Sequence, residues 1–301
     1  MQSILLIGVN RKDHTIKRMR QELKRLRIKS DFIGWSDLAF GLNTIINSTK
    51  LIETKKYTAA FFDSPCYSIL ERDKRLFFYI TNELHFLTTY LLEKNIPVAN
   101  GKFFIKYPYN DKFNQSQIFT LNNIPTIPTM HFVDNSIKKI VEKLNVLGLH
   151  YPLVIKESDT GMGRGVYRVD DQAGLGSILK NRRSKNLIFQ PFIENTCDYR
   201  IIVCKGKSLG IMKRTANKGN WKNNFSLGGR IEKFIEPAME RFAESICKKI
   251  GLDLAGIDVF KIKKGYLVIE INLFPCFEGF EEVHPKINVA REIVNLLKNK
   301  I

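Results

Sequence analysis

Alternating hydrophobic and polar positions divide the chain into a β/α half and a half rich in hairpins. In residues 1–108 they predict strands and helices in turn, at Ser3–Val9, Thr15–Arg27, Asp31–Trp35, Tyr57–Phe62, Arg72–Lys94 and Pro97–Ala99. Strands that alternate with helices favour a parallel sheet of the Rossmann-like type. No G-x-G-x-x-G follows the first strand, so we do not expect a dinucleotide site there.

A hinge at Tyr107-Pro108 separates this half from the rest. Beyond it the pattern predicts helices at Asp111–Leu121, Ser136–Leu144, Gly174–Asn181 and Lys286–Lys298. It predicts strands at Pro152–Lys156, Gly165–Val169 and Leu187–Gln190, and then a hairpin of Asp198–Cys204 with Ser208–Arg214. We expect an α/β protein with three units, residues 1–108, 109–186 and 187–301, in which the two later lobes are of the α+β class.

The most informative hairpin joins Gly256–Phe260 to Leu267–Asn272. A three-residue loop, Lys263-Lys264-Gly265, would pair Ile262 with Tyr266 and place Asp258 directly across from Glu270. In that register Ile257, Val259, Leu267, Ile269 and Ile271 form the core face, and Val268 lies on the face of the acids. Two facing carboxylates repel each other, and a divalent cation between them would remove the repulsion. Asn272 adds a third oxygen, so the hairpin predicts a Mg²⁺ or Mn²⁺ site; the alternative is an exposed hairpin with scattered acids.

A glycine-rich segment, Asp159–Gly165, lies between two predicted strands. No Lys-Ser/Thr follows it, so it is not a P-loop. Gly161 and Gly163 would let backbone N–H groups approach phosphate oxygens, and Lys156 would add a charge. The alternative is a flexible surface hairpin. Lys112 could also reach a phosphate, or it could be one more exposed lysine.

Three further segments could complete a ligand site. Gln190-Pro-Phe192-Ile193 ends a buried strand and could hold a purine edge, or it could be an ordinary linker. A Gly206-Lys207 turn would place Arg200 opposite Lys213, whereas a Lys205-Gly206 turn would shift that register. The polar loop from Trp221 to Gly229 is suited to closing over a reacting group, or is an ordinary surface loop.

Composition narrows the class of protein. The 301 residues carry 48 basic and 30 acidic side chains, a net charge of +18, which attracts polyanions. No helix-turn-helix, zinc finger or ribonucleoprotein signature is present, which argues against specific nucleic-acid binding. No apolar run approaches the roughly 20 residues that cross a bilayer. Five cysteines without a CxxC pair are typical of a reduced cytoplasmic protein.

Taken in this order, the segments resemble the ATP-grasp superfamily, and most closely its RimK-like carboxylate–amine ligases. Asp258 followed by Ile269-Glu270-Ile-Asn272-Leu-Phe-Pro275 is similar to the family's D…E-x-N-x-x-P metal motif. Counterparts of other family motifs are Asn110-Asp-Lys112, Val154-Ile-Lys156, Gln190 with Phe192 and Ile193, Asp198-x-Arg200, Lys213-Arg214, and Asn224-x-x-x-Gly228-Gly229. The resemblance covers residues 105–285. Residues 1–108 resemble the pre-ATP-grasp domain only in their alternation of strands and helices.

The resemblance implies an ATP-grasp fold and an ATP- and Mg²⁺-dependent ligase that joins a carboxylate, activated as an acylphosphate, to an amine. It implies a cofactor-binding set, Lys112, Lys156, Gly161, Gly163, Gln190, Phe192, Ile193 and Asp198. Asp258, Glu270 and Asn272 would bind metal; Arg200, Lys213 and Arg214 would be catalytic; Asn224, Gly228 and Gly229 would contact substrate. Pro191, Leu227 and Cys276 depart from the family pattern, which leaves the acceptor open.

The expected substrate is an amino acid or peptide, and the basic surface would suit an acidic one. We expect no membrane partner, and self-association stays open. The alternatives are an ATP-grasp kinase that releases a stable phosphorylated product, and a non-catalytic module that binds polyanions in a salt-sensitive way.

Overall fold

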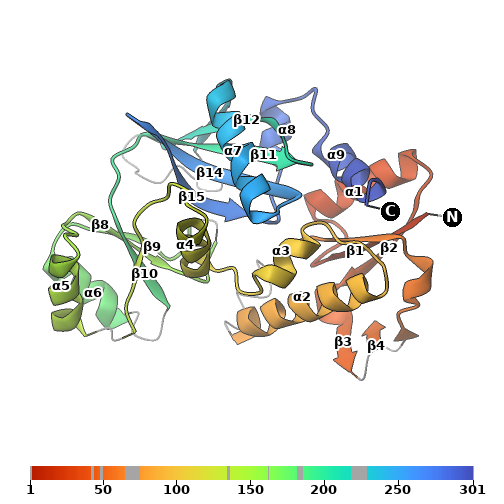
Figure 1. Cartoon of the computed structure of the whole chain (residues 1–301), viewed down its shortest axis with the longest axis horizontal. Coiled ribbons are helices and arrows are strands. Elements are labelled where there is room, and N and C mark those ends of the chain that lie inside the picture. Colours follow the sequence, from red (N-terminus) through yellow and green to blue (C-terminus); the bar gives the residue numbers. More distant parts are fainter. Residues whose placement is uncertain are drawn as a thin grey trace.

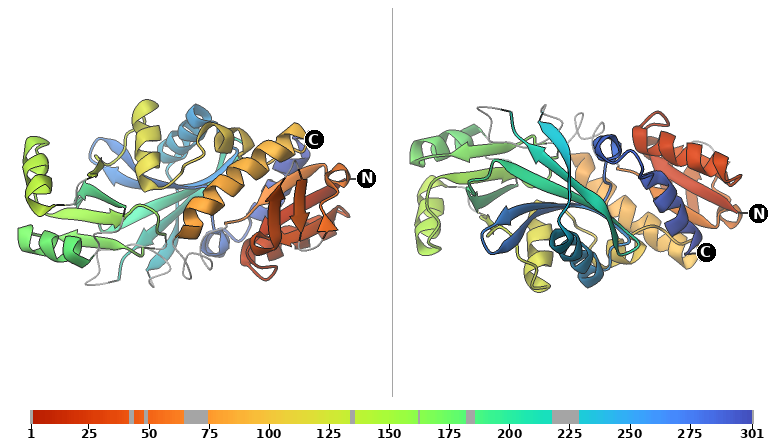
Figure 2. Two further views of the ribbon diagram at one scale, coloured as in Figure 1. Left: turned by 90° about the horizontal axis from the view of Figure 1, so that it is seen from below. Right: turned by 90° about the horizontal axis from the view of Figure 1, so that it is seen from above.

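Four β-sheets organise the computed structural model (Figure 1). It describes residues 2–41, 44–47, 50–64, 75–133, 136–161, 163–181, 186–217 and 229–300, with side chains throughout except at 40–51 and 75–81. The four-stranded sheet with its two helices lies at one end of the molecule, and the N-terminal sheet lies at the other (Figure 2). No helix in these ranges is both long and apolar enough to cross a membrane.

The N-terminal unit contains a parallel sheet in the order β2-β1-β6, as the β/α rhythm predicts. Its elements are β1 (Ser3–Gly8), α1 (His14–Arg25), β2 (Lys29–Gly34), β6 (Ala59–Phe62), α2 (Arg75–Glu93) and α3 (Gly101–Lys106). A small antiparallel sheet inserts before β6, with strands β3 (Leu38–Gly41), β4 (Thr44–Asn47) and β5 (Lys50–Leu51). The strand expected at Pro97–Ala99 is reduced to one bridge between Ala60 and Val98.

A four-stranded antiparallel sheet, β7-β10-β8-β9, forms the next unit after α4 (Lys112–Leu121). Its elements are β7 (Met130–His131), α5 (Ile137–Val146), β8 (Leu153–Glu157), β9 (Val166–Val169), α6 (Gln172–Asn181) and β10 (Leu187–Pro191). Ile155 and Phe189 point into a core shared with α5 and α6. The opposite face carries Val154 and Lys156 because side chains alternate along a strand. The boundary expected at residue 186 separates β10 from the sheet in which it pairs.

A five-stranded antiparallel sheet, β13-β12-β11-β14-β15, completes the fold. Its elements are β11 (Cys197–Cys204), β12 (Lys207–Thr215), β13 (Arg230–Phe234), α7 (Pro237–Ile250), β14 (Leu254–Ile262), β15 (Gly265–Asn272), α8 (Glu278–Val283) and α9 (Val289–Lys298). Helix α7 packs on one face of this sheet. Helix α9 packs between the sheet and α1, so the C-terminal helix shares a core with the N-terminal unit (Figure 1).

Candidate functional site

The β14–β15 hairpin places Asp258 across from Glu270, which confirms the predicted pairing. The predicted loop is wrong, because Ile262 pairs with Gly265 and leaves a two-residue loop. The extra residue lies inside the ladder instead, as a β-bulge next to Asp258. Gly265 has the positive φ that the turn requires, at 113°. The predicted loop was one residue too long and the predicted ladder one residue too short, so the two errors cancel where Asp258 meets Glu270.

The bulge also reverses which side chains face the core. Val268 pairs with Val259 and is fully buried, whereas the prediction placed Val268 on the face of the acids. Ile269, predicted to lie in the core, lines a pocket beside Glu270. A bulge adds one residue to one strand, so beyond it the side chains that a strict in-and-out alternation assigns to one face of the sheet lie on the other.

Asp258 is 2% exposed and forms ion pairs with two arginines. Strand β11 runs beside β14 and brings Arg200 opposite Asp258, where the Nε and Nη2 of Arg200 each donate to a different carboxylate oxygen at 2.7 Å. Nη2 of Arg214, on β12, lies 2.9 Å from Oδ2 of Asp258, and its Nε donates to Asp198. The result is a buried chain of alternating charges, Asp198–Arg214–Asp258–Arg200.

The arginines set the ionisation of these acids. Burial alone would raise the pKa of Asp258, but Arg200 and Arg214 outweigh it and lower that pKa to about 2. Burial likewise opposes the charge on Arg214, whereas Asp198 and Asp258 raise its pKa. Burial raises the pKa of Asp198, and Arg214 acts against that rise. Asp258 is therefore held as a carboxylate at any physiological pH.

The predicted pairing of Arg200 with Lys213 is wrong. The turn is Lys205-Gly206, and Arg200 lies opposite Met212. Lys213 points to the other face of β12 from Arg214, and its Nζ lies 2.6 Å from Oε1 of Glu232. It does not line the pocket, so we do not carry it into the proposed site.

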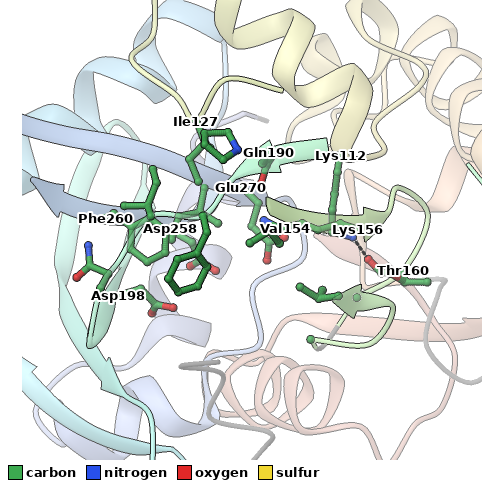
Figure 3. Close-up of a pocket in the computed structure, with 18 of the residues that line it drawn as sticks. Lys112, Ile127, Val154, Lys156, Thr160, Gln190, Asp198, Asp258, Phe260 and Glu270 are labelled. Carbon is green, nitrogen blue, oxygen red and sulfur yellow. Dashed lines mark hydrogen bonds between the residues drawn. The ribbon is translucent and has the colours of Figure 1, made fainter. Parts of the chain in front are cut away.

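The pocket lies between the four-stranded and five-stranded sheets, and Figure 3 shows its labelled side chains approaching from both. Most of the predicted site residues line it, namely Lys112, Lys156, Gly161, Gly163, Gln190, Phe192, Ile193, Asp198, Arg214, Asp258 and Glu270. Arg200 does not line the pocket itself, but its guanidinium donates to Asp258, which does. Gly256 leaves room there: a Cβ on it would lie 3.6 Å from Cδ of Arg200 and 3.2 Å from Pro275.

Two lysines face the acids from the other side of the pocket. Lys112 begins α4, whose N-cap Asp111 accepts a hydrogen bond from the N–H of Asn114. Burial lowers the pKa of Lys112, and it lowers the pKa of Lys156 to about 8, although Glu270 acts to raise both values. An ammonium so desolvated gains strongly from an anionic ligand. The lysines and acids thus form opposite walls that suit polyphosphate and cation.

The glycine-rich segment closes one side of the pocket. Lys112 donates to the backbone carbonyl of Thr160 (Figure 3). It also donates to that of Glu157, at 3.3 Å. Gly163 and Gly165 have positive φ values of 71° and 62°, as a tight turn between β8 and β9 requires. The segment therefore lies against Lys112 rather than standing out as a free surface hairpin.

The linker after β10 supplies the apolar part of the pocket. Gln190 donates to Oγ1 of Thr129 at 2.8 Å, and the N–H of Phe192 donates to the carbonyl of Pro152 at 3.0 Å. The Phe192 ring lies 4.3 Å from the guanidinium carbon of Arg168. Further apolar side chains line the same pocket, from both sheets and from the loop before β7, namely Ile127, Val154, Val166, Phe260 and Ile269. Such a slot is suited to a flat aromatic ring.

The predicted metal ligands fit a hard cation in their chemistry. Asp258 and Glu270 face each other, and Nδ2 of Asn272 lies 3.3 Å from Oδ2 of Asp258. No three His, Cys, Asp or Glu side chains form a metal cluster in the described ranges. The predicted third ligand is instead the amide oxygen of Asn272. Glu270 has no hydrogen bond or ion pair within those ranges, which leaves its carboxylate available to a ligand.

Several lining residues were not predicted. Val154 could have been found, because it lies two positions before Lys156 and so on the same face of the strand. Thr160 and Arg164 lie in the glycine-rich segment, whereas Ile127 and Asn195 carry no sequence signal of their own. Of the predicted substrate residues, Asn224 and Gly228 lie outside the described residues, and Gly229 is a buried residue just before β13.

Comparisons with known proteins agree with this geometry. The family model of the RimK-like ATP-grasp domain matches residues 109–297. The chain belongs to the RimK-like ATP-grasp family. The enzyme class predicted from sequence, an ATP-dependent carboxylate–amine ligase, is thereby confirmed at the level of the family.

Curated relatives in this family are similar over most of the chain. A probable alpha-L-glutamate ligase of Legionella pneumophila is 30% identical over 216 residues, which are 70% of this chain and 68% of the relative. A protein of the same description from Aeromonas salmonicida is 26% identical over 226 residues, covering 73% of this chain and 72% of the relative.

Solved structures show the same fold over the whole chain. The ATP-grasp ligase PsnB, complexed with a minimal precursor, aligns with a TM-score of 0.71 at 14% identity and covers 100% of both chains. A RimK domain ATP-grasp protein from Sphaerobacter thermophilus gives a TM-score of 0.69 at 17% identity, covering 98% of this chain and 99% of the other. This likeness confirms the ATP-grasp fold, including the N-terminal unit that the family model does not cover.

Proposed function

We propose that this RimK-like protein is an ATP- and Mg²⁺-dependent ligase that forms an amide bond between a substrate carboxylate and an amine. The observation that supports it most is the facing of Asp258 and Glu270 across a pocket from Lys112 and Lys156. ATP would lie between the two sheets, with its adenine in the slot after β10 and its phosphates between the lysines and the acids.

The residues would share the chemistry as follows. Lys112 and Lys156 would hold the phosphates, and Glu270, Asn272 and Asp258 would hold Mg²⁺. The ion, when bound, neutralises charge on the phosphates during phosphoryl transfer. Transfer to the substrate carboxylate would give an acylphosphate, and attack by the amine would then release phosphate. The glycine-rich segment would keep water away from that acylphosphate.

Arg200 and Arg214 are the proposed groups that stabilise negative charge on the substrate. Both oxygens of Asp258 already accept hydrogen bonds from these arginines. Direct binding of a cation to Asp258 would therefore have to displace at least one of these donors. A guanidinium released in this way would be free to face the substrate carboxylate.

The proposed substrate is an amino acid or a peptide. The curated relatives are named alpha-L-glutamate ligases, and several structural neighbours were solved with precursor peptides. The net charge of +18 would favour an acidic acceptor. Glutamate and short acidic peptides are therefore the first pairs to try.

The test is ADP and phosphate release with candidate acid–amine pairs. We expect phosphate only when both partners are present, and Glu270→Ala should abolish it while leaving the unfolding midpoint nearly unchanged. Lys213→Ala, outside the pocket, is the matched control and should retain activity. Normal turnover in Glu270→Ala would exclude the proposed metal site. A stable phosphorylated product would instead indicate a kinase.

A further inference from the structure

Gln115 lies on α4, one turn after Lys112, and contacts the strand that carries the proposed metal ligands. It is 8% exposed. Its Nε2 donates to the carbonyl of Ile271 at 2.9 Å, and the N–H of Ile271 donates to its Oε1 at 2.8 Å. The side-chain amide thus pairs with both backbone groups of one residue, as a neighbouring strand would.

The position of Ile271 gives this contact its significance. β15 is the edge strand of the five-stranded sheet, so among the described residues no further strand pairs with its outward backbone groups, apart from one bridge between Thr126 and Val268. Ile271 lies between Glu270 and Asn272, whose side chains point to the other face of the strand from its own. Fixing the backbone of Ile271 therefore fixes the residues on both sides of it.

A second anchor holds the same edge on the far side of the bulge. The N–H of Val268 donates to the carbonyl of Pro125 at 2.9 Å, and Oγ1 of Thr126 donates to the carbonyl of Val268 at 2.9 Å. Ile269 and Glu270 lie between the two anchors. The bulge is what brings Glu270 opposite Asp258. At the Val268 anchor the bond from Val268 N–H to Pro125 is between backbone groups and does not depend on a side chain, whereas the anchor at Ile271 consists of the Gln115 side chain alone.

We propose that Gln115 is a positioning residue that holds Glu270 and Asn272 in place to bind the metal ion. The inference rests on the proposed function, because it needs those two residues to be ligands. It adds that α4 couples the two walls of the pocket. Lys112 reaches toward the phosphates from the first residue of the helix, and Gln115 holds the metal-binding strand from the next turn.

The experiment measures Mn²⁺ binding by electron paramagnetic resonance in the presence of saturating ADP, and ADP binding by calorimetry in the presence of EDTA. In Gln115→Leu we expect the dissociation constant of Mn²⁺ to rise about tenfold or more, the usual effect of losing a group that orients metal ligands. The metal-free affinity for ADP should change less than about twofold, because the lysines are untouched.

The matched control is Thr126→Val, which removes a hydrogen bond from the same edge at the other anchor. It should leave Mn²⁺ binding close to that of the wild type, because the N–H of Val268 still donates to the carbonyl of Pro125. If Gln115→Leu does not fold, Gln115→Glu serves instead. Its carboxylate can accept from the N–H of Ile271 but cannot donate to the carbonyl, so Mn²⁺ binding should weaken again.

Three outcomes would overturn the inference: unchanged Mn²⁺ affinity in the Gln115 variant, equal losses of Mn²⁺ and metal-free ADP binding, or an equal effect of Thr126→Val. Failure of the proposed function would look different. In that case wild-type protein would bind no Mn²⁺ with ADP, or Glu270→Ala would bind it normally.

Discussion

At the scale of single residues, the site brings unlike charges together in a largely buried cluster. Asp258 keeps its charge while buried because two guanidinium groups share it. Removing one partner of such a buried set leaves an uncompensated charge, which typically destabilises a fold by about 3–5 kcal/mol. Asp258 therefore serves the fold as well as the proposed metal site, whereas Glu270 has no such structural contact in the described ranges.

Lys156 predicts how nucleotide binding depends on pH. Its pKa is lowered to about 8 by burial, and phosphates would raise that pKa in the complex. Metal-free ADP affinity should therefore be constant below about pH 8. Above that pH it should fall by up to about tenfold per unit, because binding must then take up a proton.

Calorimetry in EDTA between pH 7 and 9.5 would measure this. Lys156→Arg is the control, since a guanidinium stays protonated throughout the range. Any fall that remains in this variant would come from Lys112, whose pKa burial also lowers. A wild-type profile that falls no more steeply than that of the arginine variant would show that Lys156 does not bind the phosphates.

At the scale of elements, the strands were largely predictable, but their register was not. The hairpin pattern placed Asp258 across from Glu270 correctly, but by way of the wrong loop. A bulge adds one residue without a turn signal, so period-two reasoning cannot distinguish a longer loop from a bulged strand. In the other hairpin the Arg200–Lys213 pairing required a Gly206-Lys207 turn, whereas the chain has the Lys205-Gly206 turn and a bulge between Ile202 and Val203.

Pairing between distant strands set a further limit. Arg200 and Asp258 meet because β11 lies beside β14, and nothing local in either strand indicates that neighbour. Helix α7 was not predicted, although local signals for it were present: Pro237 at its first turn and Gly251, with a φ of 77°, at its end. Helix ends and turns can therefore be predicted from local residues, whereas the order of strands in the sheet needed the folded chain or the family resemblance.

The turn between β8 and β9 gives a prediction at this scale. Gly165 has a φ of 62°, and a Cβ there would lie 2.9 Å from the side chain of buried Glu157. Gly165→Ala should shift the glycine-rich segment and weaken ADP binding. Gly148, with a φ of 65° and no atom within 4 Å of a Cβ, is the matched control.

Gly148→Ala should lose only about 1–2 kcal/mol of unfolding free energy from backbone strain and bind ADP normally. Denaturant unfolding and ADP titration of both variants would separate the two effects. Equal ADP affinity in both would mean that the close approach of Gly165 to Glu157 does not shape the pocket.

At the scale of the whole molecule, the N-terminal unit and the five-stranded sheet share their core. Helix α9 follows that sheet in sequence, yet its Ile293 and Leu297 pack with Ile4 and Met19 of the N-terminal unit. The core on the other face of the sheet also includes residues of β1 and β6. The four-stranded unit, in contrast, has a core of its own. Motion within the fold should therefore be easiest for the unit that carries Lys156 and the glycine-rich segment.

Asn100 tests how firmly the other two units are joined. It is 2% exposed, and its side chain bonds the backbone of Asp253 and Leu254, while its own N–H donates to the carboxylate of Asp253. Asn100→Gly keeps the left-handed backbone, at a φ of 59° in the wild type, but leaves these buried groups unpaired. It should lose about 2–3 kcal/mol of unfolding free energy. Asn100→Ala should lose about 1–2 kcal/mol more, because alanine strains that conformation.

Hydrogen exchange shows whether the loss of unfolding free energy affects the N-terminal unit and the five-stranded sheet alike. If the two units unfold together, Asn100→Gly should speed exchange in β1 and in β14 by the same factor, while β8 changes less. Faster exchange in β14 alone, with β1 protected as in the wild type, would mean that the shared core does not couple them. The pocket would then lie between three independently moving parts instead of between one mobile lobe and one rigid body.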